Sequence, residues 1–118
     1  ASFSQMAAIE AIKGSQSESN KMVAEFKARR DIIVSGLNDI SGIECPLPKG
    51  AFYAFPNVEK TGMSSSDFAS NLLTETGVAL LDGESFGQYG KGHIRISFAN
   101  SRANLSEAVS RIRKFVNS

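Results

Sequence analysis

The chain has 118 residues, of which 42% are hydrophobic and 21% charged, a composition typical of a single soluble globular domain. Thirteen basic side chains are nearly balanced by twelve acidic ones, and the net charge of +1 argues against binding to nucleic acid or to an anionic membrane. No apolar run approaches the roughly 20 residues of a membrane-spanning helix, and a single cysteine, Cys45, excludes an internal disulfide.

Side chains that commonly bind metals or attack substrates are sparse. Cys45 and His93 are the only cysteine and histidine, and no sequence motif joins them, so neither a metal site nor a nucleophilic pair is expected. Cys45 is interpreted as a small buried hydrophobic residue. A lone cysteine and an N-terminal segment without the pattern of a secretory signal predict a cytoplasmic protein.

The first predicted element is a short helix that ends near Lys13. Ser2 and Gln5 have the spacing of a capping box, in which two side chains satisfy free backbone N–H groups at a helix start. Gly14 is expected to take the left-handed conformation that ends many helices. A polar stretch over residues 15–19 then separates this helix from the rest of the chain.

A long helix is predicted next, because apolar residues recur on one face at steps of three, four and seven. Gly36 lies inside this helix, where glycine costs about 1 kcal/mol relative to alanine, so a bend or a close contact is expected there. Gly42 is expected to end the helix. The apolar face comprises Met22, Phe26, Ile33, Leu37 and Ile40.

The next segments are predicted to be short. Pro46 and Pro48 cannot donate a backbone N–H, which excludes a regular strand around them. Residues 51–55 are predicted to form a strand that Pro56 closes. This strand is the first candidate for a central sheet.

A second helix–strand unit follows. Ser64 and Asp67 form another capping box, and Gly77 is expected to end the helix that they begin. Residues 78–81 are predicted to form a short buried strand. The glycine-rich residues 83–92 are interpreted as a loop that approaches a ligand or a neighbouring segment closely, and not as a phosphate-binding loop, because a strand follows it.

The C-terminal part of the chain carries the clearest patterns. Residues 93–99 alternate between apolar and polar, which indicates a half-buried strand. The order of elements predicts an α+β fold with a small mixed or antiparallel sheet that helices cover on one face, and no second domain or repeat. The last helix has a complete apolar stripe, formed by Leu105, Ala108, Val109, Ile112, Phe115 and Val116.

Arg95 is the one candidate for anion binding. In its strand Ile94 and Ile96 point toward the helices, so Arg95 points the other way. An arginine on a rigid strand presents a planar fork that matches a carboxylate. The strand pattern alone favours the alternative, an arginine that is simply exposed to solvent. His93 has no partner for an acid–base pair, and nothing positions Asp82 and Glu84, which share a turn, as such a pair.

Four segments resemble motifs of class I aminotransferases of the aspartate aminotransferase type. Pro48–Pro56 resembles their PKGAFY-FP segment, and Gly77–Gly87 resembles their GVA--PG--FG segment. Gly92–Ala99 resembles their G-IRIS-A strand, and Arg29–Asp31 resembles their RRD. Because the motifs occur in the expected order along almost the whole chain, the chain resembles the C-terminal portion of such an enzyme.

The resemblance implies a fold-type I enzyme in which a small C-terminal domain closes over the substrate. Residues 1–15 would be the end of the large cofactor-binding domain or a linker helix, and residues 16–118 the small substrate-clamping domain. Arg95 would bind the α-carboxylate of the substrate, and Phe52 would lie near the mouth of the active site. Asp82 stands where many members have proline, which a turn tolerates.

The resemblance also implies a homodimeric parent enzyme that uses pyridoxal phosphate and acts on amino acids and 2-oxo acids. In the family the Schiff-base lysine and the other cofactor-binding groups lie upstream. None of the lysines here sits in that motif, so we expect no catalytic residue, no bound pyridoxal phosphate and no activity in this chain alone. An exposed apolar patch is expected on the first two helices, where the large domain would pack.

Two alternatives remain open at this stage. The chain could be a free-standing module that binds small carboxylates at Arg95 without catalysis. It could also be a protein-interaction domain that uses its first helix as a docking element. The amino acid used as substrate cannot be read from these residues, since the carboxylate site is common to all of them.

Overall fold

The computed structural model describes residues 1–118 and combines four α-helices with a small three-stranded sheet. The helices are α1 Ser2–Lys13, α2 Ser17–Asn38, α3 Ser65–Thr76 and α4 Arg102–Val116. The strands are β1 Tyr53–Ala54, β2 Leu81–Asp82 and β3 Ile94–Ser97. Three 3-10 turns connect them, η1 Glu59–Thr61, η2 Gly83–Phe86 and η3 Gln88–Gly90.

The sheet has the order β1-β3-β2, and both strand pairs are antiparallel. Tyr53 lies opposite Ser97, and Leu81 lies opposite Arg95. β3 is therefore the central strand. The expected α+β architecture is confirmed, and the sheet is antiparallel.

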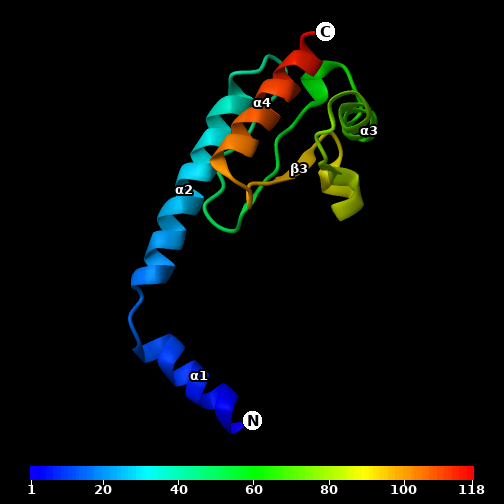
Figure 1. Ribbon diagram of the computed structural model, residues 1–118. Coiled ribbons are helices and arrows are strands. Elements are labelled where there is room, and N and C mark those ends of the chain that lie inside the picture. The colour runs from blue at the N-terminus through cyan, green and yellow to red at the C-terminus, as the bar shows by residue number, and fades with distance from the viewer.

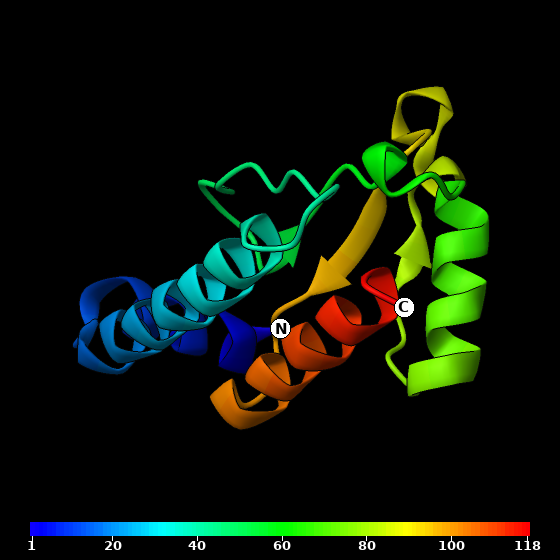
Figure 2. The same cartoon turned by 90° about the horizontal axis from the view of Figure 1, so that it is seen from above.

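Burial alternates along β3 as the sequence pattern predicts. Ile94 and Ile96 are buried, whereas Arg95 is half-buried and Ser97 is exposed. In Figure 2 α4 (orange to red) lies between α2 (cyan) and α3 (green). The buried side of the sheet thus packs against the helices, which supply Ile33, Leu37, Phe68, Leu72, Leu105, Val109, Ile112 and Phe115 to one core.

The pair α2 and α4 forms the most extensive helix contact, and the two run alongside each other in Figure 1. Gly36 lies where they touch. A Cβ at this position would be 2.7 Å from Cγ1 of Val109, a β-branched side chain with little freedom to move. The close contact expected at Gly36 is therefore confirmed.

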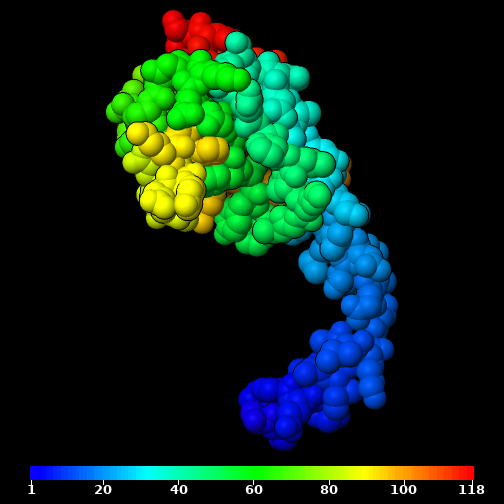
Figure 3. All heavy atoms as spheres, turned by 180° about the vertical axis from the view of Figure 1, so that it is seen from behind, coloured from blue at the N-terminus to red at the C-terminus, as the bar shows by residue number.

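α1 lies apart from the folded body, as Figure 3 shows. None of its residues is buried, and the radius of gyration of 17.4 Å exceeds the roughly 13 Å of a compact 100-residue domain. The expected exposed apolar side chains on the first two helices are present, namely Phe3, Met6, Ile9, Ile12, Met22 and Val23. Neither α1 nor any other helix has the length and apolar character required to cross a membrane.

The expected helix ends are partly confirmed. Ser64 Oγ accepts a hydrogen bond from the Asp67 N–H at the start of α3, and Gly77 ends this helix with φ of 72°. The capping box at Ser2 is wrong, because Ala1 caps α1 without a side-chain bond. Gly14 has an extended conformation and not the left-handed one, so the chain continues outward from α1 toward α2.

The expected strands at 51–55 and 78–81 are too long. Ala51 has φ of 57°, which turns the chain just before β1, and Pro56 follows closely after it. Before β2 the chain runs free of the sheet, and Leu81 is exposed, so the expectation of a buried strand at 78–81 is wrong. Pairing with β3 is therefore limited to two residues on each side.

Two further expectations concern α2 and the loop that follows it. The helix ends at Asn38, before Gly42, and Met22 is exposed instead of facing the core. The reason is that the first half of α2 extends beyond the sheet toward α1, as seen in Figure 1. Cys45 is buried as expected.

Candidate functional site

Arg95 occupies the centre of the uncovered face of the sheet. Residues directly opposite in antiparallel strands project to the same side. The register therefore places Tyr53, Leu81 and Ser97 around Arg95, on the side away from the helical core. Because β3 is the central strand, β1 and β2 on either side fix the backbone that carries Arg95.

Two aromatic rings contact the guanidinium group of Arg95. Its Cζ lies 4.0 Å from the ring centroid of Phe86 and 4.6 Å from that of Tyr53. Both distances are within the range of cation–π attraction. The rings come from η2 and β1, so three separate segments of the chain meet at this cation.

Arg95 is the arginine without an anionic partner. Each of the other five has a nitrogen within 4.0 Å of a carboxylate oxygen, in pairs formed by Arg29, Arg30, Arg102, Arg111 and Arg113. The Arg95 side chain makes neither an ion pair nor a hydrogen bond with the protein. Its N–H donors are therefore free to bind an external anion.

Phe52 lies next to this site and packs against Tyr53. Its ring centroid is 4.5 Å from that of Tyr53 and 6.1 Å from that of Phe26. It also lines a shallow groove of about 300 Å³ between α2 and residues 48–51. Phe52 is thus linked to Arg95 through Tyr53.

The loop from Gly83 to Gly92 is tightly packed against itself. Gly83 donates a backbone hydrogen bond to His93 O at 2.8 Å, and a Cβ on Gly90 would lie 1.9 Å from the Gly83 oxygen. No other residue fits at Gly90 without moving the backbone. The expected close approach to a neighbouring segment is confirmed, because a Cβ on Gly83 would lie 2.5 Å from the His93 oxygen.

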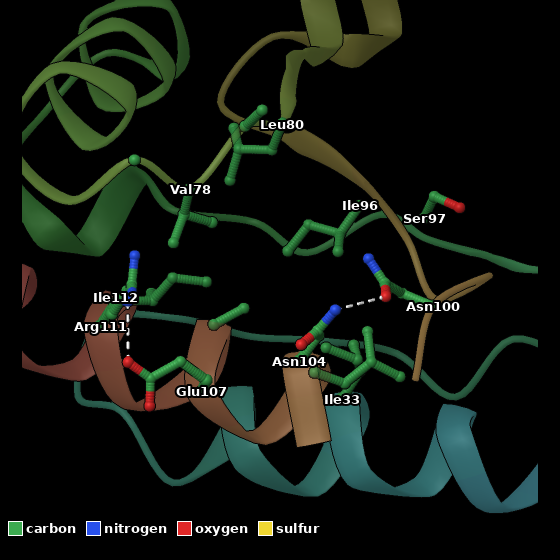
Figure 4. A pocket seen from close by; sticks show the side chains of 14 residues that line it. Ile33, Val78, Leu80, Ile96, Ser97, Asn100, Asn104, Glu107, Arg111 and Ile112 are labelled. Atoms are coloured by element: carbon green, nitrogen blue, oxygen red, sulfur yellow. Dashed lines mark hydrogen bonds and ion pairs between the residues drawn. The ribbon is translucent and has the colours of Figure 1, made fainter. Parts of the chain in front are cut away.

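A groove of about 380 Å³ lies elsewhere, between α4 and residues 77–80. Figure 4 shows its apolar floor, which includes Ile33, Ile96 and Ile112. Its polar side chains are already paired, because Arg111 binds Glu107 at 2.9 Å and Asn104 binds Asn100 at 2.9 Å. The groove offers no free charge, which makes the Arg95 face the stronger candidate.

The pKa shifts of Glu25 and Cys45 have structural explanations. Arg102 and then Arg29 lower the pKa of Glu25 from 4.5 to about 2, because both donate hydrogen bonds to its carboxylate. Burial raises the pKa of the Cys45 thiol to about 11, which disfavours the reactive thiolate. No group of three or more histidine, cysteine or acidic side chains is placed to hold a metal ion.

The neighbours of Arg95 do not form an acid–base pair. Asp82 Oδ1 accepts the Glu84 N–H at 3.2 Å and so caps η2. His93 stacks on Phe55 at 5.3 Å, and its Nδ1 lies 2.8 Å from the Lys91 oxygen. The arrangement can bind and orient a carboxylate, but it has no group placed to move a proton from a ligand.

The sequence pattern located Arg95 and its direction, but it did not place the two rings against the guanidinium group. Tyr53 could have been found from the register, since it faces the same side as Ser97. Phe86 could not, because its position depends on the conformation of a loop without regular periodicity.

The chain matches the family model for aminotransferase class I and II over residues 1–112. It is 45% identical over 116 residues to an aspartate aminotransferase of Pyrococcus horikoshii, covering 97% of this chain and 30% of that protein. It is 43% identical over 116 residues to a (5-formylfuran-3-yl)methyl phosphate transaminase of Methanocaldococcus jannaschii, covering 98% and 30%. The solved structure of an alanine aminotransferase from Pyrococcus furiosus superposes with a TM-score of 0.90 at 36% identity, covering 96% and 29%.

These relatives match this chain over only part of their length, and their names differ. The chain spans about 30% of the length of the curated proteins that it matches. The names of the first two give different substrates, although they are 45% and 43% identical to this chain. Similarity in this region therefore does not identify a substrate.

Proposed function

Because this chain belongs to the class I and II aminotransferase family, we propose that it is the C-terminal part of a pyridoxal-phosphate-dependent aminotransferase, in which Arg95 binds the substrate α-carboxylate. The observation that carries this proposal is the free guanidinium group of Arg95 on the central strand. It contacts two aromatic rings and has no anion of its own. A planar carboxylate matches such a fork with two parallel N–H···O bonds.

We assign residues 16–118 to the small substrate-clamping domain and residues 1–15 to the end of the large domain or to a linker helix. The exposed apolar side chains of α1 support this division, since they lack a partner within the chain. A homodimeric enzyme would bury further surface there. In such an enzyme, closure of the small domain would exclude water and strengthen the bonds of Arg95 to the carboxylate.

Pyridoxal phosphate would be held by other parts of the enzyme. The strands and the η2 turn around Arg95 contain no lysine, and no α-helix begins within these segments to receive a phosphate. These residues alone do not fit the cofactor, whose role would be to accept electrons from the substrate. We predict that the purified 118-residue chain shows no visible absorbance after incubation with pyridoxal phosphate and dialysis, and a retained visible band would contradict this.

The α-carboxylate assignment is tested by Arg95→Lys in the complete enzyme. Lysine keeps the charge but loses the fork, so kcat/KM for amino acids should fall roughly 30-fold or more, mainly through a higher KM. This corresponds to a loss of about 2 kcal/mol or more in transition-state stabilisation. Arg113→Lys, at an exposed position on α4 away from this face, is the matched control and should leave the kinetics unchanged. Near-normal kinetics of Arg95→Lys would contradict the assignment.

A further inference from the structure

We propose that Phe86 is a positioning residue that orients the Arg95 guanidinium for a carboxylate, and that residues 83–90 form a rigid support for its ring. This inference rests on the proposed function, because it gives Phe86 a role at the same carboxylate site. A free arginine side chain loses rotamer freedom when it binds an anion, so a carboxylate binds more tightly when that freedom is already lost.

The kind of contact matters more than its strength. An acidic partner would also hold Arg95 still, but it would occupy the N–H donors that a substrate needs. An aromatic ring attracts the cation through its face and accepts no conventional hydrogen bond from the fork. Phe86 lies closest, at 4.0 Å from Cζ, and Arg95 has no carboxylate partner in the chain. The contact therefore orients the guanidinium and leaves its donors available.

The backbone around Phe86 is held in place at several points. Asp82 caps η2, Gly87 N donates to Glu84 O at 3.0 Å, and Gly83 N donates to His93 O at 2.8 Å. Gly83 and Gly90 contact each other so closely that neither has space for a side chain. These contacts explain how a loop with three close glycines can still hold an aromatic ring in a defined position.

A second aromatic ring supports the ring of Phe86 from another side. Phe55 lies 6.5 Å away in an edge-to-face arrangement and itself stacks on His93. Tyr89, in the same loop, is 89% exposed and makes no aromatic contact. The two loop aromatics thus differ in environment, and Phe86 is the one attached to the site. Tyr89 provides a matched control.

The first test measures the order of the Arg95 side chain by ¹⁵N NMR relaxation of its Nε–H group in the 118-residue chain. In Phe86→Leu the order parameter should fall into the flexible range, below about 0.6, while Tyr89→Leu should match the unmodified chain. Backbone amides of residues 83–90 are measured in the same samples. Loss of Arg95 order with an ordered loop supports the proposal, and retained order overturns it.

Phe86→Met is the second variant, because methionine fills similar space without a ring face. It should also release Arg95, whereas Phe86→Tyr keeps the ring and should preserve the order of the Arg95 side chain. If Met preserves that order as well as Tyr does, packing alone fixes Arg95 and the proposed role of the ring is overturned. These readouts need neither cofactor nor substrate.

The second test uses the complete aminotransferase. Phe86→Leu should raise KM for the amino acid about three- to tenfold and change kcat little, which corresponds to a cation–π contact at a partly exposed site. Tyr89→Leu should leave KM unchanged. If Arg95→Lys has no effect, the proposed function fails. If Arg95→Lys impairs the enzyme while Phe86→Leu behaves like Tyr89→Leu, only the role of Phe86 fails.

Discussion

The two faces of β3 are built from alternate residues of one four-residue strand, yet they have opposite environments. Ile94 and Ile96 pack into a core that α2, α3 and α4 enclose. Arg95 and Ser97 point to a face that no helix covers, where the neighbours are aromatic and partly exposed. The difference shows how one strand can combine a stable scaffold with a binding group. The covered side fixes the backbone, and the fixed backbone presents the cation.

The covered face should give the largest effect on stability. Ile94 is fully buried, so Ile94→Ala removes packed apolar atoms and leaves a cavity. We expect a loss of about 3 kcal/mol in the free energy of unfolding, measured by urea denaturation. A loss below about 1 kcal/mol would mean that this face is not the core that the burial pattern indicates.

The open face should give a much smaller effect in the same assay. Arg95→Ala removes contacts with two partly exposed rings but breaks no ion pair, so it should cost about 1 kcal/mol or less. Ser97→Ala, on the same face, is the control for substitution at an exposed strand position. If Arg95→Ala destabilises the chain as much as Ile94→Ala, Arg95 has a structural role and the contrast between the faces is lost.

A smaller effect concerns the ion pairs of Glu25, which lies on α2 and pairs with Arg29 on the same helix and with Arg102 on α4. The pKa of Glu25 is lowered to about 2 in the folded chain, so its bonds to Arg102 and Arg29 stabilise the fold above pH 4.5 and are lost as pH falls toward 2. The difference in urea midpoint between the unmodified chain and Glu25→Gln should therefore shrink over this range. Glu75→Gln, which removes an exposed carboxylate without an ion pair, controls for general charge loss. A difference in urea midpoint that stays constant from pH 6 to 2 would contradict a stabilising role for the Glu25 ion pairs.

Periodicity predicted the regular parts of this molecule well. The apolar stripe of α4, the alternation of β3 and the capping pair Ser64 and Asp67 were all readable, because each depends on neighbours within a few residues. The conformation of residues 78–81 was not readable from the sequence. Their apolar side chains suit a buried strand, but the backbone pairs with β3 only at its end.

The candidate site was likewise predictable only where it depends on local sequence patterns. The strand pattern gave the direction of Arg95, and family motifs gave its expected role, which remains a proposal. The position of Phe86 depends on a folded loop. The exposure of α1 depends on its position away from the folded body. Local sequence does not encode either property. The three-dimensional arrangement was needed to show that aromatic rings, and no acidic side chain, contact Arg95.

The carboxylate-binding role of Arg95 is tested most directly by comparing two substrates in the complete enzyme. The rate of the first half-reaction is measured for an amino acid and for the corresponding amine, which lacks only the α-carboxylate. Arg95→Lys should lower kcat/KM for the amino acid by roughly 30-fold or more and leave the value for the amine within about twofold. An equal loss for both substrates would show that Arg95 does not act through the carboxylate and would contradict the account.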